Sequence, residues 1–302
     1  MSGLQIVIVS NGLGNQMSQF AFYLQKRAFD ENVIWIVDKN SAFDHNGFEL
    51  DKVFGINYQN TFRKEAIHLL YRICGIKKYK FLSKPLLMFL KFCGITIIEE
   101  DYHYNFNHQI LNSSGGTLTF FKGGWHSPHY FKAVASEVRR LFKFNHALLD
   151  SVNLTYAKRI LDSSSVSIHV RRGDYINSTN YQTFGKVCTI EYYAKAIKEL
   201  EKSNENLKYF IFTNDSEWVI KNFDFIDFEL IDHNKGSNSW IDMYLMSLCK
   251  HHVNANSTFS WWGAWLSDYK SGITIVPREF IYNREFVDIY PEAWTKIPTS
   301  IN

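Results

Sequence analysis

Two adjacent arginines give the sequence its clearest sign of chemistry. Residues 169–175 read HVRRGDY and continue residues 166–168, an apolar run that predicts a buried strand. Neighbouring side chains of a strand point to opposite faces, so either Arg171 or Arg172 is expected to face a ligand, and the spacing leaves open which. A guanidinium binds a pyrophosphate through two parallel hydrogen bonds and keeps its charge at any working pH. Asp174 is expected either to orient an arginine or to accept a proton; the plain alternative for the whole segment is a surface turn.

A glycine turn near the N-terminus offers a second candidate ligand site. Gly12 and Gly14 follow an apolar strand at residues 4–10 and precede a helical pattern. Such glycines let the backbone approach a phosphate at a helix N-terminus. With Asp38 ending the next strand, the pattern is close to a dinucleotide-binding fingerprint, but Met17 stands where the third glycine belongs. A nicotinamide-dependent oxidoreductase is therefore kept as an alternative.

Two further strands end in polar residues. Residues 208–213 (KYFIFT) are followed by Asn214 and Asp215, and an aspartate at such a boundary is expected to cap the next helix or to bind a nucleotide. Small polar residues also open the helix expected at 258–267, where side chains and backbone N–H groups suit a phosphate. These residues are Asn256, Ser257 and Thr258. Capping of that helix is the plain alternative for the two hydroxyl residues.

Hydrophobic periodicity predicts the elements that must position these residues. Strands are expected at 4–10, 33–38, 117–121, 166–170, 208–213, 228–231, 251–255 and 272–276, and helices at 16–29, 128–142, 147–161, 191–202, 216–223, 240–248 and 258–267. Alternating strands and helices favour parallel sheets, with ligands at the carboxyl ends of the strands. We therefore predict two α/β halves that meet near residue 150.

The composition fits a globular protein. The chain has 302 residues, 46% of them hydrophobic and 21% charged, and a net charge of +3. That near balance argues against a dedicated nucleic-acid-binding protein. The four cysteines form no CxxC pair, no uncharged apolar run has membrane-spanning length, and no signal peptide is recognised. These patterns predict a reduced, cytoplasmic location.

One segment departs from this balanced charge. Residues 61–94 hold eight lysines and arginines against a single acid, Glu65, and interleave them with large apolar residues. Such a segment is suited to the surface of an anionic membrane. A pair of solvated helices is the equal alternative.

The sequence lacks several common catalytic motifs. There is no phosphate-binding GxxxxGK[ST] loop, no HExxH zinc motif and no GxSxG nucleophile elbow. The Asp-x-Asp pair that would hold a divalent metal on a nucleotide sugar is also missing. If a pyrophosphate binds, arginines and helix N-termini must neutralise it, and no metal ligands are expected.

Six segments together resemble glycosyltransferase family 11, the α-1,2-fucosyltransferases. They are NGLGNQMSQFAFY at 11–23, HNGFELDKVF at 45–54, GGWHSPHYF at 123–131, HVRRGDY at 169–175, FTND at 212–215 and NSTFSWWGAWL at 256–266. Two departures concern acceptor choice: Asn11 replaces the family's usual first glycine, and GGWHS replaces a usual GYWQS. The resemblance implies a GT-B-like α/β fold, in which two Rossmann-like domains flank a cleft. Residues 1–150 would form the domain on the acceptor side, and residues 151–302 the domain that binds GDP-fucose.

The implied reaction is the inverting, metal-independent transfer of L-fucose from GDP-fucose to the 2-hydroxyl of a terminal β-galactoside in a cell-surface glycan. The resemblance gives no cofactor, and its partners are the donor and a galactose-terminated acceptor. Fucose transfer with another linkage and non-catalytic carbohydrate binding remain alternatives. The candidate site residues form three groups: catalytic Asp174, Arg172 and Asn15; donor-binding Gly12, Gly14, Asn15, His169, Arg171, Arg172, Asp215, Asn256, Ser257 and Thr258; acceptor-binding Asn11, Trp125 and His126.

Overall fold

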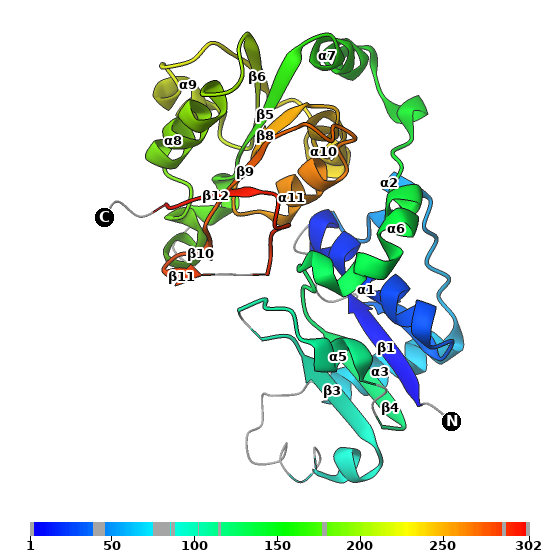
Figure 1. Ribbon diagram of the computed structural model, residues 1–302. Helices are drawn as coiled ribbons and strands as arrows, with labels where there is room; N and C mark the ends of the chain where they lie inside the picture. Colours follow the sequence, from blue (N-terminus) through cyan, green and yellow to red (C-terminus); the bar gives the residue numbers. More distant parts are fainter. Residues whose placement is uncertain are drawn as a thin grey trace. The chain divides into compact units, whose positions relative to one another are not determined.

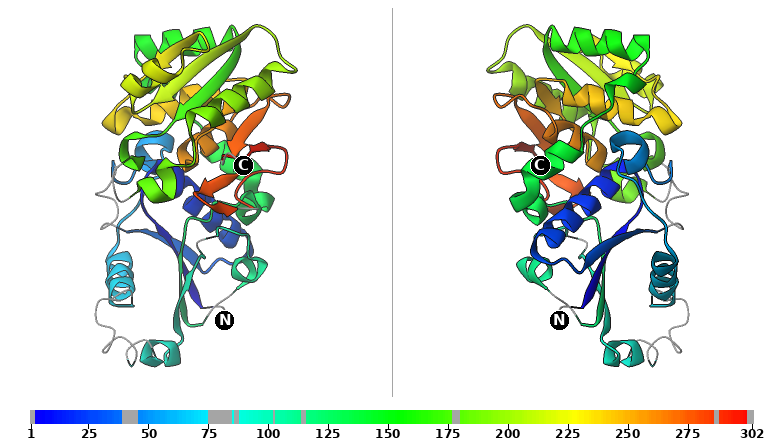
Figure 2. Two further views of the ribbon diagram at one scale, coloured as in Figure 1. Left: turned by 90° about the vertical axis from the view of Figure 1, so that its left-hand side faces the viewer. Right: turned by 90° about the vertical axis from the view of Figure 1, so that its right-hand side faces the viewer.

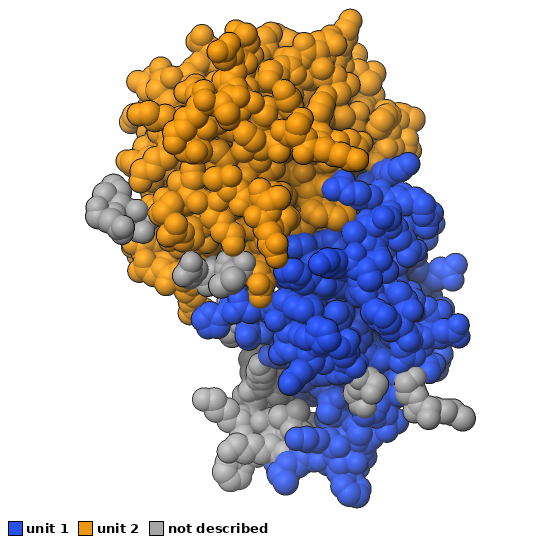
Figure 3. Space-filling model, in the orientation of Figure 1, with its two compact units in different colours: residues 1–143 blue, residues 144–302 orange. Residues whose placement is uncertain are grey.

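The computed structural model describes residues 3–38, 46–74, 85, 88–101, 103–113, 116–176, 180–285 and 288–299. The chain forms two compact units, residues 1–143 and 144–302 (Figure 3). The sequence placed the boundary near residue 150. Each unit has its own parallel sheet, which confirms the predicted α/β class with two Rossmann-like sheets. The cleft that the resemblance implies stays a prediction.

Unit 1, residues 1–143, is built on a four-stranded parallel sheet in the order β2-β1-β4-β3. Its strands are β1 (Leu4–Val9), β2 (Val33–Val37), β3 (Ile95–Glu99) and β4 (Leu118–Lys122). The central strand β1 is almost wholly apolar and buried, as expected for a parallel strand covered on both faces. Sequence analysis missed β3, which lies at the edge of the sheet.

Helices cover both faces of this sheet. They are α1 (Leu13–Phe29), α2 (Leu50–Phe54), α3 (Phe62–Cys74), α5 (His108–Asn112) and α6 (Ala135–Leu141). On one face, Ile6 and Ile8 of β1 belong to the same core cluster as Ile67 and Tyr71 of α3. Figure 2 shows α1 on the opposite side of the sheet from α3.

The prediction of one continuous helix at 128–142 is wrong. The structure has a 3₁₀ helix at Pro128–Val134, followed by the α-helix α6. Ser127 caps the first helix with its side chain, and proline stands at its start. Phe131 leaves helical geometry, with φ −137° and ψ 21°, so the chain bends before α6 begins.

Unit 2, residues 144–302, contains a six-stranded sheet in the order β12-β9-β8-β5-β6-β7, with all neighbouring strands parallel. The strands are β5 (Ser164–Val170), β6 (Leu207–Thr213), β7 (Phe228–Ile231), β8 (His251–Val253), β9 (Thr274–Pro277) and β12 (Thr295–Ile297). An antiparallel pair, β10 (Glu279–Ile281) and β11 (Arg284–Glu285), follows β9. The sequence patterns had not indicated β10, β11 or β12.

The helices of unit 2 fall on two sides of its sheet. They are α7 (Ser151–Leu161), α8 (Ile190–Glu201), α9 (Ser216–Asn222), α10 (Trp240–Ser247) and α11 (Thr258–Trp265). Figure 1 shows α8 and α9 on one side and α10 and α11 on the other. Val166, Ile168 and Val170 of β5 pack into the core with Tyr192 and Tyr193 of α8. Alternation along β5 therefore directs His169 to the opposite side.

The turn between β1 and α1 explains one departure from the family motif. Asn11 has a left-handed backbone with φ 63°, a conformation that glycine adopts freely and asparagine tolerates better than other residues. Its carbonyl oxygen accepts a 2.6 Å hydrogen bond from Nε2 of Gln16. Asparagine in place of glycine therefore satisfies the same backbone requirement.

We expect Asn11→Gly to preserve stability and Asn11→Val to lower the free energy of unfolding by about 1–2 kcal/mol, because a β-branched residue is strained at this positive φ. Urea unfolding of the two variants and the parent protein measures the difference. Equal stability of the valine variant would contradict the importance of the left-handed backbone.

Candidate functional site

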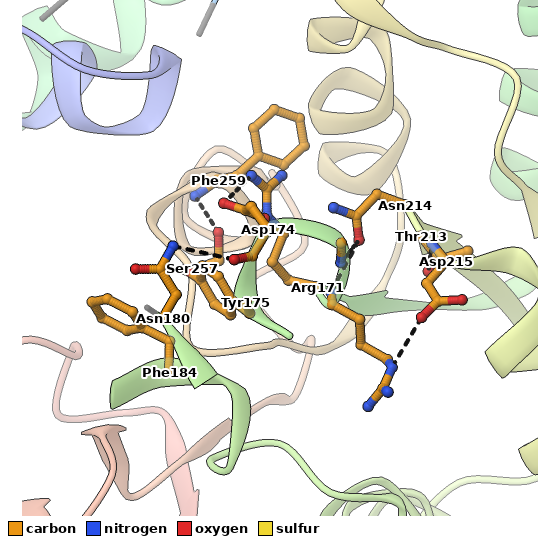
Figure 4. Close-up of polar contacts among 12 residues, drawn as sticks. Arg171, Asp174, Tyr175, Asn180, Phe184, Thr213, Asn214, Asp215, Ser257 and Phe259 are labelled. Atoms are coloured by element: carbon orange, nitrogen blue, oxygen red, sulfur yellow. Dashed lines mark hydrogen bonds and ion pairs between the residues drawn. The ribbon is translucent and has the colours of Figure 1, made fainter. Parts of the chain in front are cut away.

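Three neighbouring strands of unit 2 bring the predicted donor-binding residues to one edge of the sheet. Strand β5 pairs with β6 on one side and β8 on the other, and both pairs are parallel. The three carboxyl ends therefore lie at the same edge. The segments that follow them hold the arginines, Asn214 with Asp215, and Asn256 to Thr258. Figure 4 labels Arg171, Asn214, Asp215 and Ser257 among these residues.

Arg171 is engaged by a carboxylate three residues away. Its Nε lies 2.8 Å from Oδ1 of Asp174, and a terminal nitrogen donates to Oδ2 at 3.0 Å. This two-point contact occupies both carboxylate oxygens of Asp174. The geometry therefore favours Asp174 as the residue that orients Arg171, which is one of the two roles expected from the sequence.

Arg172 is held in a different way. Its Nε lies 3.1 Å from Oδ2 of Asp215, and its guanidinium carbon lies 4.1 Å from the centre of the Trp218 ring. Its two terminal nitrogens make no hydrogen bond to another residue that the structure describes. The Asp215 contact and the stacking on Trp218 thus fix the guanidinium of Arg172, while its two terminal nitrogens stay available to donate to a ligand.

Asn214 holds the turn that carries the arginines. Its Oδ1 accepts hydrogen bonds from the backbone N–H groups of Arg172 and Gly173, at 2.9 and 3.1 Å. A Cβ atom at Gly173 would lie 2.6 Å from Nδ2 of Asn214, so glycine is needed for this close approach. The turn after β5 is therefore fixed by the residue that follows β6.

Asp215 caps a helix with one carboxylate oxygen and holds Arg172 with the other. Its Oδ1 accepts a hydrogen bond from the Trp218 N–H at 3.2 Å and caps helix α9, which confirms the predicted helix cap. Its other carboxylate oxygen contacts Arg172. Binding of a nucleotide by Asp215 stays a prediction.

The residues after β8 differ in what they offer a ligand. The side-chain nitrogen of Asn256 donates to the carbonyl oxygens of Phe184 and Phe280 at 3.3 and 3.0 Å, so this buried side chain joins the helical segment Tyr181–Gly185 to β10. Ser257 caps α11 by accepting from the Phe259 N–H. Thr258 is partly exposed, and its hydroxyl makes no hydrogen bond to another described residue. Of the three side chains, that of Thr258 is the most available.

His169 is a buried, neutral group at the end of β5. Only 6% of the residue is exposed, and Nδ1 has no hydrogen-bond partner among the described residues. Burial, with the nearby charge of Arg171, lowers the pKa of His169 to about 3. The ring is therefore neutral at physiological pH, and its centre lies 5.8 Å from that of Phe259 in the first turn of α11.

In unit 1, amide side chains organise the turn after β1. Gln16 donates to the carbonyl oxygens of Asn11 and Gly47 and accepts from the Glu49 N–H. Gly12 and buried Gly14 are backbone positions at the start of α1. Asn15 lies beside them and is partly exposed, and its side-chain amide has no hydrogen-bond partner among the described residues.

Two of the predicted acceptor residues are core residues. The Trp125 ring is fully buried and stacks on Phe22 with a centroid distance of 4.4 Å. His126 is also buried, its Nδ1 lies 3.2 Å from the hydroxyl oxygen of Ser18, and burial lowers its pKa to about 3. Direct contact of either ring with an acceptor is therefore not supported by this structure. Asn11, in contrast, is exposed.

Sequence analysis missed Glu100, a carboxyl group directly after β3. Its Oε2 accepts from the N–H groups of Gly124 and Trp125 at 2.7 and 2.8 Å, while Oε1 is buried without a described partner. Burial raises its pKa to about 7. Trp125 has a positive φ of 52°, so Glu100 stabilises a strained turn. The acidic run at 99–101 was the available signal, but the preceding strand had gone unrecognised.

Unit 2 also contains a buried carboxyl group that accepts a hydrogen bond and has a raised pKa. Asp242, in the first turn of α10, accepts a 2.8 Å hydrogen bond from Asn234, which follows β7. Asn234 in turn exchanges hydrogen bonds with the side chain of Asn153. Burial raises the pKa of Asp242 to about 8. This network joins α7, α10 and the segment after β7.

The described part of the chain shows no metal-binding cluster, no membrane-spanning helix and no disulfide. Within it, no group of three His, Cys, Asp or Glu side chains is placed to hold a metal ion. No described helix combines the length and the apolar composition needed to span a bilayer. All four cysteines are free, and only Cys93 is exposed.

A family model and one bacterial relative match nearly the whole chain. The model of the family described as "Glycosyl transferase family 11" matches residues 4–298. An alpha-1,2-colitosyltransferase of Escherichia coli is 33% identical, over 96% of this chain and 97% of the relative. The human galactoside alpha-(1,2)-fucosyltransferase 1 is 25% identical, over 54% of this chain and 47% of that protein.

A similar fold occurs in a solved structure. The alpha-1,6-fucosyltransferase NodZ, soaked with GDP-fucose, aligns with a TM-score of 0.50 and 14% identity, over 88% of this chain and 93% of the other. At that identity the likeness concerns the fold alone.

The buried carboxyl group of Glu100 predicts a pH-dependent stability. Because its pKa is raised to about 7 in the folded protein, the stability gained from its protonated form is present at low pH and is lost as the pH rises through this value. Glu100→Gln keeps an oxygen acceptor and cannot ionise. We expect its stability relative to the parent protein to increase by about 2 kcal/mol between about pH 5 and about pH 8.

Urea unfolding at the two pH values measures this change, and Glu99→Gln is the matched control. Glu99 is the exposed neighbour of Glu100 and contacts Lys122 at 3.3 Å. A pH dependence that is the same in Glu100→Gln and the parent protein would show that Glu100 does not titrate in this range.

Proposed function

The chain belongs to glycosyltransferase family 11, as its motifs predicted, and from this membership we propose that it transfers L-fucose from GDP-fucose to the 2-hydroxyl of a terminal β-galactoside with inversion. One observation carries the proposal. The carboxyl ends of β8, β5 and β6 bring together Thr258, neutral His169 and the two available donor groups of Arg172. The family assignment favours glycosyl transfer over the oxidoreductase alternative based on Gly12, Gly14 and Asp38.

Arg172 is proposed to bind the pyrophosphate of the donor. In the reaction, the galactose oxygen forms a bond to the anomeric carbon as the bond from that carbon to the GDP oxygen breaks. Negative charge develops on the departing phosphate, and a donor already fixed toward that charge stabilises the transition state. Asp215 and Trp218 fix the guanidinium in this way.

Helix α11, which follows the neighbouring strand β8, is proposed to bind the same pyrophosphate. Its N-terminus carries partial positive charge and unpaired N–H groups, which favour a phosphate. Thr258, the first residue of the helix, adds an available hydroxyl. We assign the donor contact after β8 to Thr258, and a supporting role to Asn256 and Ser257, whose side chains are occupied.

His169 contributes as a neutral group in this proposal. With its pKa lowered to about 3, it carries no proton to deliver to the leaving GDP. A nucleoside diphosphate is stable as an anion and needs no such proton. The free Nδ1 of His169 is available to a polar group of the donor or of a bound water molecule.

The acceptor side of the proposal rests on Asn11 and Asn15, which are both accessible at the start of α1. Asn15 can align the acceptor hydroxyl through its amide. Asp174 is occupied by Arg171 at both oxygens, so its proposed role is to position that arginine. The hydroxyl proton leaves late in bond formation and passes to water in this proposal.

A second donor is favoured by one relative. The Escherichia coli enzyme with 33% identity is a colitosyltransferase, and colitose is L-fucose without its 3-hydroxyl group. Both sugars keep the same anomeric centre and 6-deoxy group. The alternative proposal is therefore transfer of colitose from its GDP-activated form by the same residues.

The function is tested by incubating the protein with GDP-fucose and lactose in excess EDTA and identifying the product by mass spectrometry. We expect fucosylated lactose with a 1,2-linkage and release of GDP, because the proposed pyrophosphate contacts come from Arg172 and α11 rather than from a metal ion. Parallel reactions with GDP-colitose compare the two donors.

Activity restored only by Mn²⁺ would contradict the metal-independent account. A clear preference for the colitose donor would replace fucose with colitose in the proposal. Absence of transfer from either donor, together with absence of GDP binding, would overturn the proposed function.

A further inference from the structure

Helix α3 of unit 1 presents two opposite apolar faces. Its buried face, with Ile67, Tyr71 and Cys74, packs in the core cluster of the sheet. Phe62, seven residues before Leu69, is 91% exposed, and Leu69 is 58% exposed. At about 100° per residue, these two side chains share a face that points away from the buried one.

The outward face continues along the helix. Ile73, eleven residues after Phe62, belongs to the same stripe and is also exposed. Such a second stripe adds nothing to the folding of the unit, since leaving large apolar side chains in water is unfavourable. Figure 2 shows that α3 covers the side of the sheet opposite α1, so its second face points away from the sheet.

Helical residues 88–92 repeat this arrangement. Leu90 is buried in the same core cluster as the inner face of α3. Met88 and Phe92, each two positions from Leu90, lie on the other side of the helical turn and are 74% and 89% exposed. Phe89 beside them is exposed as well. Both helical segments therefore bury one side on the same face of the sheet and leave large apolar side chains on the other.

Basic residues flank these apolar side chains. Arg63 and Arg72 are exposed and lie on either side of the outer stripe of α3, at about 100° and −80° from Phe62. Lys91 is exposed next to Phe92. Residues 61–94 contain eight basic residues and one acid, although Lys77, Lys78, Lys80 and Lys84 lie outside the described residues.

We propose that this surface, the α3 patch formed by Phe62, Leu69, Ile73, Met88, Phe89 and Phe92 with Arg63, Arg72 and Lys91, docks the protein on an anionic lipid bilayer. The apolar side chains enter the boundary between headgroups and acyl chains, and the basic side chains bind lipid phosphates. Charge complementarity favours the anionic bilayer as the occupant, because residues 61–94, which carry the patch, hold eight basic residues and one acid. The inference does not depend on the proposed transfer reaction.

Among the described residues, helix α7 also exposes apolar side chains, namely Val152, Leu154 and Leu161. Leu154 and Leu161, seven positions apart, share one face, whereas Val152 lies about 160° from Leu154 around the helix. That face has two large apolar side chains, whereas the α3 patch has six on two helical segments. These α7 residues provide a matched control, since their removal changes exposed apolar area without touching the α3 patch.

The test is vesicle flotation with phosphatidylcholine alone and with equal parts of phosphatidylcholine and phosphatidylglycerol. We expect binding to the anionic vesicles only. Arg63→Gln with Arg72→Gln should weaken this binding roughly 25-fold, at about fivefold for each charge. Phe62→Ser with Leu69→Ser and Phe92→Ser should weaken it at least about tenfold.

The controls are Lys195→Gln with Lys198→Gln on α8, and Val152→Ser with Leu154→Ser on α7, all at exposed positions. They should bind vesicles as the parent protein does, and circular dichroism should show that every variant is folded. Failure of the parent protein to bind anionic vesicles would overturn the proposal. Equal binding to neutral vesicles, or unchanged binding of both α3 variants, would also overturn it.

Discussion

The common direction of the strands in unit 2 is the constraint on which the candidate site depends. Because β8, β5 and β6 are parallel neighbours, the segments after them begin at one edge of the sheet. Side chains that are more than 80 residues apart in sequence, such as Arg172 and Thr258, are brought together only by this topology. The shared direction of the strands therefore explains how motifs that are far apart in the sequence come together at one candidate site.

Hydrogen bonds and ion pairs at this edge determine which polar side chains remain available to a ligand. Asn214 fixes the turn that carries both arginines, and Asp174 binds Arg171 through both oxygens. Arg172 has one carboxylate contact and a stacking partner, which fix it while leaving its terminal nitrogens available. This difference assigns the proposed phosphate contact to Arg172, a choice that the alternation of a strand cannot make.

The sequence predicted best those features that depend only on residues close together in the chain. The apolar runs of β5 and β6 and the cap at Asp215 follow from local patterns, and the family motifs identify the chain. What the sequence did not provide was the partner of each side chain. Asn256 is unavailable because its side chain donates to Phe184 and Phe280, which are distant in sequence, and these partners could not be read from the local pattern. Trp125 was likewise expected to bind the acceptor, whereas the structure buries its ring against Phe22 in the core. Glu100 was missed because its two partners come from the loop after β4.

Calorimetric titration with GDP and GMP tests the central claim most directly, because GMP lacks the β-phosphate of the pyrophosphate that Arg172 is proposed to bind. The account predicts that GDP binds at least about tenfold more tightly than GMP, and that Arg172→Lys removes most of this difference, since a charge-assisted contact contributes about 1.5–3 kcal/mol. The control is Arg159→Lys, which alters an arginine–carboxylate pair with Glu229 away from this edge. Equal affinities of GDP and GMP in the parent protein, or an undiminished difference in Arg172→Lys, would contradict the account.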